Sequence, residues 1–207
     1  MSSIIRSIIS GFIRKIRPVV NRGGNNRIMI LSNLKKSTII INGDNNNVSI
    51  ANGCIINNCK IYINGDRNNL VIDEKARLLG GAVITLDGNG TLHIGKNAGI
   101  RKVSFLAKDA SIEIGELCMF SNDIIVRNHD SHKVINLEDG KISNLAQDIV
   151  LGRHVWIGQN VTILKGCNIG DDSILALGSV VTKSCPPNSI MAGNPAKIVK
   201  SGITWDY

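Results

Sequence analysis

The sequence predicts a solenoid of stacked parallel β-strands, and three observations support this fold class. From Leu151 to Val181 an aliphatic residue recurs at every sixth position. Nearer the N-terminus, similar blocks of sequence recur about 22 residues apart, and periods near 20 residues are typical of stacked supersecondary units. Aromatic residues make up only 3% of the chain, so short aliphatic and β-branched side chains must fill the interior.

The six-residue repeat is clearest in the last third of the chain. Its aliphatic positions are Leu151, Ile157, Ile163, Ile169, Leu175 and Val181. Four residues after each of them lies a small or β-branched residue, namely Val155, Val161, Cys167, Ser173, Ser179 and Cys185. Three six-residue units make one triangular coil, so we expect the aliphatic residues to stack in ladders while the small residues let the corners turn. An ordinary amphipathic strand would instead show a period of two.

The repeat continues towards the N-terminus with a changing register. Six-residue spacing links Ile94, Ile100, Leu106 and Ile112, and after a two-residue offset it links Ile114, Phe120 and Val126. Still earlier, the block at residues 41–48 recurs at 63–70 and, more loosely, at 86–92. Each block places Gly, Asn or Asp after a β-branched run, where a positive φ is easily accommodated. We therefore expect one coil per block.

Residues 1–36 differ in composition from the body. They carry eight basic residues and no acidic one, whereas the remaining residues hold 16 of each. Apolar residues at helical spacing predict a short amphipathic helix over residues 3–17, ending at Pro18, followed by a linker. This helix would dock on the body or a neighbouring subunit, or lie on an anionic membrane surface. The neutral body offers no basic stripe interleaved with aromatics, which argues against nucleic-acid binding.

The five cysteines favour a reducing compartment. Their number is odd, they form no CxxC pair, and three of them occupy small-residue positions of the repeat. We expect buried, reduced thiols and a cytoplasmic protein. No apolar run approaches the length of a membrane span.

The repeat is interrupted at residues 127–148. This segment contains Asn128, His129, Asp130, Ser131 and His132 in succession. A solenoid has no deep interior cavity, so a loop that leaves one coil is where a reactive group can meet a ligand on the outer wall. The alternative is a solvated polar loop without chemistry.

Four features together resemble the hexapeptide-repeat acetyltransferases: the six-residue run, the histidine loop, the segment His154-Val-Trp-Ile-Gly158, and the segment from Cys185 to Lys200 that contains Asn-Pro-Ala-Lys. The Asp-Ser-His loop and the Asn-Gly-Asp-Asn blocks resemble the branch that O-acetylates sugars of capsules, lipopolysaccharide and polysialic acid. The resemblance covers roughly residues 38–200. It implies a left-handed parallel β-helix, acetyl-CoA as donor, no metal, and a homotrimer with active sites between subunits.

The resemblance also implies roles for individual residues. A loop histidine is the general base that takes the proton of the acceptor hydroxyl, a role that suits imidazole at neutral pH. His132 is the first choice, because it precedes Trp156 by the same interval as the base of the family precedes its tryptophan. His129 is the second choice, and Asp130 would orient either ring.

The donor contacts carry over from the same resemblance. Trp156 would pack beside the acyl-CoA arm. Thr182 and Lys183 would meet the cofactor on the last coil, and Lys197 and Lys200 would approach the CoA phosphates. For the lysines, a solvated chain end is the alternative.

Four other functions use related scaffolds. N-acetyltransferases of amino sugar nucleotides usually begin with a nucleotide-binding βαβ domain, and serine acetyltransferases with a large helical one. A zinc enzyme similar to γ-class carbonic anhydrases would need three histidines, nominally His93, His129 and His132. A non-enzymatic binding solenoid would show outward ladders of Thr or aromatic residues, and the sequence has neither.

The sequence thus predicts three regions: a basic helix and linker at 1–36, a β-helix acyltransferase domain at 37–200 with its loop at 127–148, and a tail at 201–207. The expected activity is transfer of an acetyl group from acetyl-CoA to a hydroxyl of a bacterial surface glycan. The expected place is the cytoplasm, with the basic helix at the inner face of the membrane. Which sugar and which hydroxyl are acetylated is left open.

Overall fold

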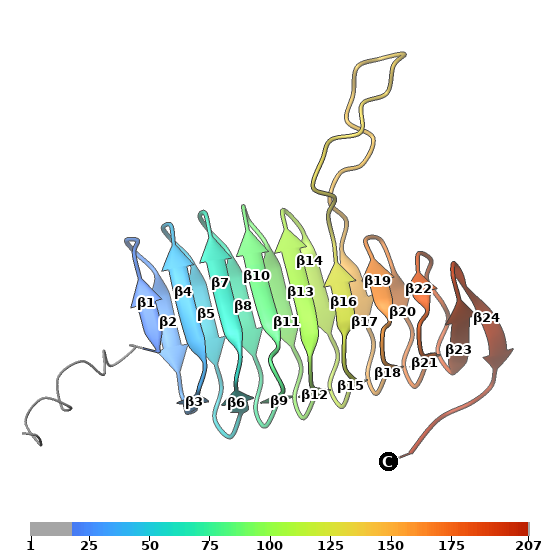
Figure 1. Cartoon of the computed structure of the whole chain (residues 1–207), viewed down its shortest axis with the longest axis horizontal. Coiled ribbons are helices and arrows are strands. Elements are labelled where there is room, and N and C mark those ends of the chain that lie inside the picture. Colours follow the sequence, from blue (N-terminus) through green and yellow to red (C-terminus); the bar gives the residue numbers. More distant parts are fainter. Residues whose placement is uncertain (1–17, 207) are drawn as a thin grey trace, which may run out of the picture.

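A computed structural model describes residues 18–206 and contains three long sheets (Figure 1). Sheet A holds β1 (Val19–Asn21), β4 (Thr38–Asn42), β7 (Lys60–Asn64), β10 (Val83–Asp87), β13 (Val103–Lys108), β16 (Ile124–Arg127), β19 (Thr162–Leu164) and β22 (Val180–Val181). Sheet B holds β2 (Arg27–Ile30), β5 (Asn47–Ile50), β8 (Asn69–Ile72), β11 (Thr91–Ile94), β14 (Ser111–Ile114), β17 (Ile149–Leu151) and β20 (Asn168–Ile169). Sheet C holds β3 (Leu34–Lys35), β6 (Ile55–Asn57), β9 (Arg77–Leu78), β12 (Gly99–Ile100), β15 (Met119–Phe120), β18 (Trp156–Ile157), β21 (Ile174–Leu175), β23 (Ser189–Gly193) and β24 (Ala196–Ser201).

From β1 to β22 the chain visits the three sheets in the fixed order A, B, C, so each circuit is one coil of a triangular prism. Neighbouring strands are parallel everywhere except between β23 and β24, which form an antiparallel pair at the C-terminal end. We call the rows of turns between sheets the A/B, B/C and C/A edges. The predicted parallel β-helix is confirmed.

The coils are shortest at the C-terminal end of the prism. The register pairs Ile41 with Ile63 in sheet A, 22 residues on, but Ile163 with Val181, only 18 residues on. Only the short coils consist of three six-residue units. This explains why the six-residue period is strict after Leu151 and drifts before it.

The core is the stack of inward-facing side chains. All the aliphatic and small positions of the repeat after Leu151 are buried, as predicted. The expected ladder position Leu106 is wrong, because β13 alternates Val103, Phe105 and Ala107 inward and turns Leu106 outward. The six-residue β13 belongs to one of the longer coils, in which a strict six-residue count falls out of phase with the alternation of the strand.

The Asn-Gly-Asp turns lie at the A/B edge. Asn45 and Arg67 adopt positive φ of 58° and 59° at equivalent points of successive coils. A Cβ on Gly43 would lie 2.2 Å from the carbonyl oxygen of Gly65, so the close approach of the coils requires glycine there. Side-chain amides also stack between coils, since the backbone N–H of Asn68 donates to Oδ1 of buried Asn46 at 2.8 Å.

The solenoid begins earlier than the sequence indicated. Residues expected to be linker form the first coil, with β1 paired to β4 and β2 paired to β5. The expected helix at residues 3–17 lies outside the described residues. Within residues 18–206 there is no helix long and apolar enough to cross a membrane.

Candidate active site

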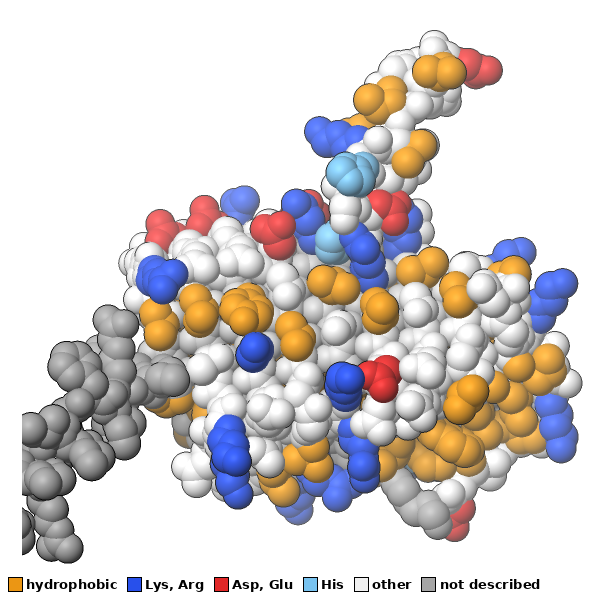
Figure 2. All heavy atoms as spheres, viewed as in Figure 1, with side chains coloured by type: hydrophobic (Ala, Val, Ile, Leu, Met, Phe, Trp, Pro, Cys, Tyr) orange, Lys and Arg blue, Asp and Glu red, His pale blue; other side chains and the backbone are white. Residues whose placement is uncertain are grey.

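The predicted histidine loop leaves the prism at the A/B edge, between β16 and β17, and projects far from the body (Figure 1). Its two arms are joined by an antiparallel bridge between Ile135 and Ile142, and Leu137 is 99% exposed. Figure 2 shows histidine side chains where the loop leaves the body. The tip of the loop is therefore far from the prism, whereas its histidines lie near its base.

Both loop histidines line a cavity of about 180 Å³ at the base of the loop, together with Lys108 and Asn144. His132 is exposed, whereas His129 is half-buried and its Nδ1 lies 3.2 Å from the backbone oxygen of Asp130. The imidazole of His132 is therefore open to an incoming hydroxyl.

Asp130 anchors the loop, and its role in orienting a histidine stays a prediction. Its Oδ2 accepts hydrogen bonds from Nζ of Lys165 and from Nδ2 of Asn144. The hydrogen bond from Lys165, followed by that from Asn144, lowers the pKa of the Asp130 carboxyl below its ordinary value. Lys165 belongs to the next coil, so this contact ties the loop to the prism. No spacing in the sequence indicates this contact, because the two residues meet only through stacking of coils.

Asn128 fixes the point where the loop begins. It is fully buried, its Oδ1 accepts the backbone N–H of Lys108 at 2.9 Å, and its carbonyl accepts that of Gln147 at 3.0 Å. The two ends of the loop are thus joined directly through Asn128 and Gln147. Among residues 18–206 no hydrogen-bond partner is found for Nδ2 of Asn128.

Trp156 lies on the outer face of sheet C, where its side chain is 45% exposed. Strand register places Trp156, Ile174, Ile190 and Lys200 in one row across β18, β21, β23 and β24. Three strand spacings separate Trp156 from Lys200, about 14 Å. Trp156 also borders a cavity of about 220 Å³ that reaches Asn122 at the C/A edge.

The other predicted donor residues are divided between two faces. Lys197 and Lys200 are exposed on β24, in the same sheet as Trp156. Thr182 and Lys183 follow β22 at the A/B edge, the edge that carries the histidine loop. Within one chain, Trp156 and Lys200 therefore share a row of sheet C, and the histidine loop and Lys183 share the A/B edge. The sheet C residues and the A/B-edge residues lie on different parts of the prism.

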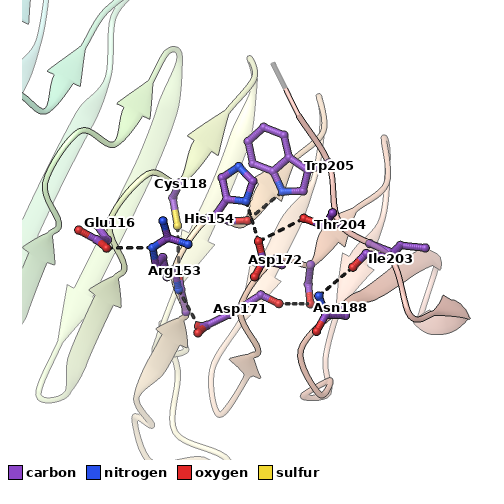
Figure 3. Close-up of polar contacts among 12 residues, drawn as sticks. Glu116, Cys118, Arg153, His154, Asp171, Asp172, Asn188, Ile203, Thr204 and Trp205 are labelled. Atoms are coloured by element: carbon purple, nitrogen blue, oxygen red, sulfur yellow. Dashed lines mark hydrogen bonds and ion pairs between the residues drawn. The ribbon is translucent and has the colours of Figure 1, made fainter.

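An additional cluster surrounds His154 at the B/C edge (Figure 3). His154 Nδ1 lies 2.8 Å from Oδ1 of Asp172, and its ring stacks on that of Trp205 with centroids 4.0 Å apart and planes 11° apart. The hydrogen bond from His154 is the main reason that the pKa of Asp172 is lowered. Neither Asp172 nor Trp205 was predicted from the sequence. The signal that could have pointed to Trp205 is that it is one of only two tryptophans in a chain with 3% aromatic residues.

The thiols and His93 do not form part of a site of the predicted kind. All five cysteines are free and buried, as expected. Burial raises the pKa of Cys118 to about 12, so this thiol is not poised as a nucleophile.

His93 lies on sheet B between Asp73 and Glu113, at 2.8 and 3.1 Å, and not with the loop histidines. In the described part of the chain no three side chains are grouped as metal ligands.

Sequence comparison identifies the repeat and relatives with the same architecture. Residues 148–183 match the family model "Bacterial transferase hexapeptide (six repeats)". The chain is 36% identical to a polysialic acid O-acetyltransferase of Neisseria meningitidis over 190 residues, which cover 89% of this chain and 87% of that protein. It is 38% identical to a polysialic acid O-acetyltransferase of Escherichia coli over 95 residues, 46% of this chain, but these span only 31% of that longer protein.

Two solved structures have the same fold. The polySia-specific acetyltransferase NeuO gives a TM-score of 0.87 at 31% identity, covering 91% of this chain and 88% of that one. The polysialic acid O-acetyltransferase OatWY gives 0.87 at 32% identity, covering 92% of each. The predicted left-handed parallel β-helix of a hexapeptide-repeat transferase is therefore confirmed. Within that class, the chain belongs to the hexapeptide-repeat O-acetyltransferases.

Proposed function

We propose that the protein transfers an acetyl group from acetyl-CoA to a hydroxyl of a bacterial surface glycan of the capsular, polysialic acid type. The observation that carries this proposal is the similarity to two polysialic acid O-acetyltransferases over nine tenths of the chain. In this proposal the histidine loop supplies the base, and the outer face of sheet C around Trp156 supplies the donor-binding surface.

In the proposed mechanism His132 is the general base. Its imidazole takes the proton of the sugar hydroxyl as the oxygen attacks the thioester carbonyl, which gives a tetrahedral intermediate. Collapse of the intermediate breaks the carbon–sulfur bond, and the imidazolium returns the proton to the leaving thiolate. The products are the O-acetyl ester and free CoA. The exposed position of His132 at the mouth of the loop cavity supports this role.

The complete site, in this proposal, forms between subunits of a homotrimer. The loop projects away from its own prism, while Trp156 lies on a different face. If sheet C of a neighbouring prism faced the loop, His132 would lie close to the outer face of sheet C that carries Trp156. The donor would lie along sheet C, with its acyl arm at Trp156 and its phosphates near Lys197 and Lys200. Thr182 and Lys183, at the loop edge, would contact the same donor from the subunit that supplies His132.

The protein would work in the cytoplasm, close to the inner face of the membrane. The basic excess of residues 1–36 over the neutral body supports this location, since anionic lipids attract clustered Lys and Arg. At the inner face of the membrane, the enzyme would lie close to where acceptor glycans of this type are assembled.

The test is a thiol-release assay with acetyl-CoA and a panel of sialylated and neutral glycans, followed by mapping of the acetylated hydroxyl. We expect CoA release only with acidic capsular-type acceptors. His132→Ala should lower kcat by about 10²- to 10⁴-fold, and His129→Ala should have a much smaller effect. Equal losses at both positions, or full activity of the His132 variant, would contradict the assignment of the base.

A further inference from the structure

The C-terminal tail follows the B/C edge back across three coils (Figure 3). Asn188 Nδ2 donates to the carbonyl of Ile203 at 2.9 Å, and the N–H of Ile203 donates to the carbonyl of Asn188 at 3.1 Å. Thr204 Oγ1 then donates to Oδ1 of Asp172 at 3.3 Å in the next coil. Successive tail residues therefore contact successive coils on the way towards Trp156.

The tail ends in a tight contact with the coil that carries Trp156. Trp205 Nε1 donates to the carbonyl of His154 at 2.8 Å, while its ring stacks on the imidazole of His154. The Nδ1 of the same imidazole is also within hydrogen-bond distance of Asp172. The indole is consequently fixed by one hydrogen bond and one stack, and it is half-buried.

Trp205 also contacts Trp156. The two indole centroids lie 5.9 Å apart at an interplanar angle of 45°, within the range of favourable aromatic pairs. Trp156 thus lies between Trp205, on the side of His154 and the B/C edge, and the cavity that continues to Asn122 at the C/A edge. One side of the Trp156 indole therefore borders a cavity, and its other side contacts Trp205 of the tail.

We propose that Trp205 is a positioning residue for the donor: it holds the indole of Trp156 in the orientation that receives the acyl arm of acyl-CoA. This inference rests on the proposed function. A half-exposed aromatic side chain on a short strand loses rotamer freedom when it binds a ligand, and a side chain that is already held loses less. The tail therefore lowers the entropic cost of donor binding without a contact to the reacting atoms.

The composition of the chain makes this directly measurable, because Trp156 and Trp205 are its only tryptophans. In Trp205→Phe, all indole fluorescence comes from Trp156, and CoA binding can be followed by its quenching. In Trp205→Ala, the released Trp156 should become more accessible to acrylamide. Phe retains a ring that can stack on His154 but lacks the N–H, so it serves as the conservative variant.

We expect Trp205→Ala to raise the Kd for CoA and the KM for acetyl-CoA about three- to tenfold. The kcat at saturating donor and the KM for the glycan should change less than twofold, and Trp205→Phe should recover most of the donor affinity. Thermal unfolding of each variant reports on the fold. A merely structural tail would lower Tm and the active fraction but leave KM for acetyl-CoA unchanged.

The outcomes separate the two proposals. If the wild-type protein does not bind CoA, the proposed function fails and this inference with it. If the wild-type protein binds CoA but Trp205→Ala binds it with the same Kd and quenching, only the role of Trp205 is overturned. A raised donor KM that Phe reverses supports it.

Discussion

Lys165 reaches across one coil to the carboxylate of Asp130 and so connects the histidine loop to the prism. Because Asn144 binds the same carboxylate from the returning arm, this single pair fixes both arms of the loop at its base. The position of His132 therefore depends on a contact that lies two residues away from it.

Lys165→Ala should lower kcat/KM by about 10- to 100-fold, since small displacements of a catalytic base are costly. The Tm should change little, because both side chains of the pair are partly exposed and such pairs contribute little to stability. Steady-state kinetics and calorimetry check both expectations. The matched control is Lys141→Ala, which removes the pair with Asp139 farther out in the same loop and should retain wild-type activity. Equal kinetics for the two variants would contradict the role of Lys165.

A site between subunits predicts complementation of two inactive variants. His132→Ala and Trp156→Ala are each expected to be nearly inactive alone. After mixed refolding at equal amounts, the mixture should recover about a quarter of the wild-type activity, because about three quarters of the trimers are hybrids and each hybrid has one intact site of three. The measurement is CoA release before and after subunit exchange. No recovery, despite exchange shown by native mass spectrometry, would place both residues in one subunit's site.

The aliphatic ladder predicts a large loss of stability at Ile163, which is fully buried on β19. Ile163→Ala should lower the free energy of unfolding by about 2–5 kcal/mol, since it removes buried methyl groups and leaves a cavity in a close-packed core. Thr162→Ala on the same strand points outward and should cost less than about 1 kcal/mol. Denaturant titration followed by circular dichroism compares them. Similar losses at both positions would be inconsistent with the alternation.

The Asp172 contact predicts a defined pH dependence. Its pKa is lowered in the folded protein, chiefly by the hydrogen bond from His154. The stabilisation is therefore fully present above the unfolded carboxyl pKa of about 3.9, and it is lost as the pH falls through the lower folded value. Asp172→Asn should be less stable than wild type at pH 6, and the difference should disappear towards pH 2. Urea titrations across this range measure it, and a difference that grows with acidity would refute it.

The basic N-terminal segment predicts binding to anionic lipid. Removal of residues 1–17, with their four basic residues, should release the protein from phosphatidylserine vesicles at low salt. Neutral vesicles are the control, and sedimentation is the measurement. Unchanged binding after truncation would assign the attraction to the folded body instead.

Much of the fold followed from the sequence, and the site followed only in part. Between Leu151 and Cys185 the period of six identified the two buried positions of each repeat unit, because an 18-residue coil has no extra residues to disturb the phase. Leu106 was misplaced because longer coils shift the phase. The contact of Lys165 with Asp130 and that of Trp205 with Trp156 join distant positions, so they depend on which coil edges lie in line. Spacing along the chain does not encode that alignment.

The buried amide ladder has a consequence for the length of the molecule. The same hydrogen bond, from a backbone N–H to a side-chain amide oxygen, recurs between successive coils at Asn26, Asn46 and Asn68. These side chains are uncharged, so a further copy of the block would extend the prism with the same contacts. Each copy moves the first coil about 4.8 Å farther from the histidine loop. The number of N-terminal coils therefore sets the distance between the first coil and the histidine loop.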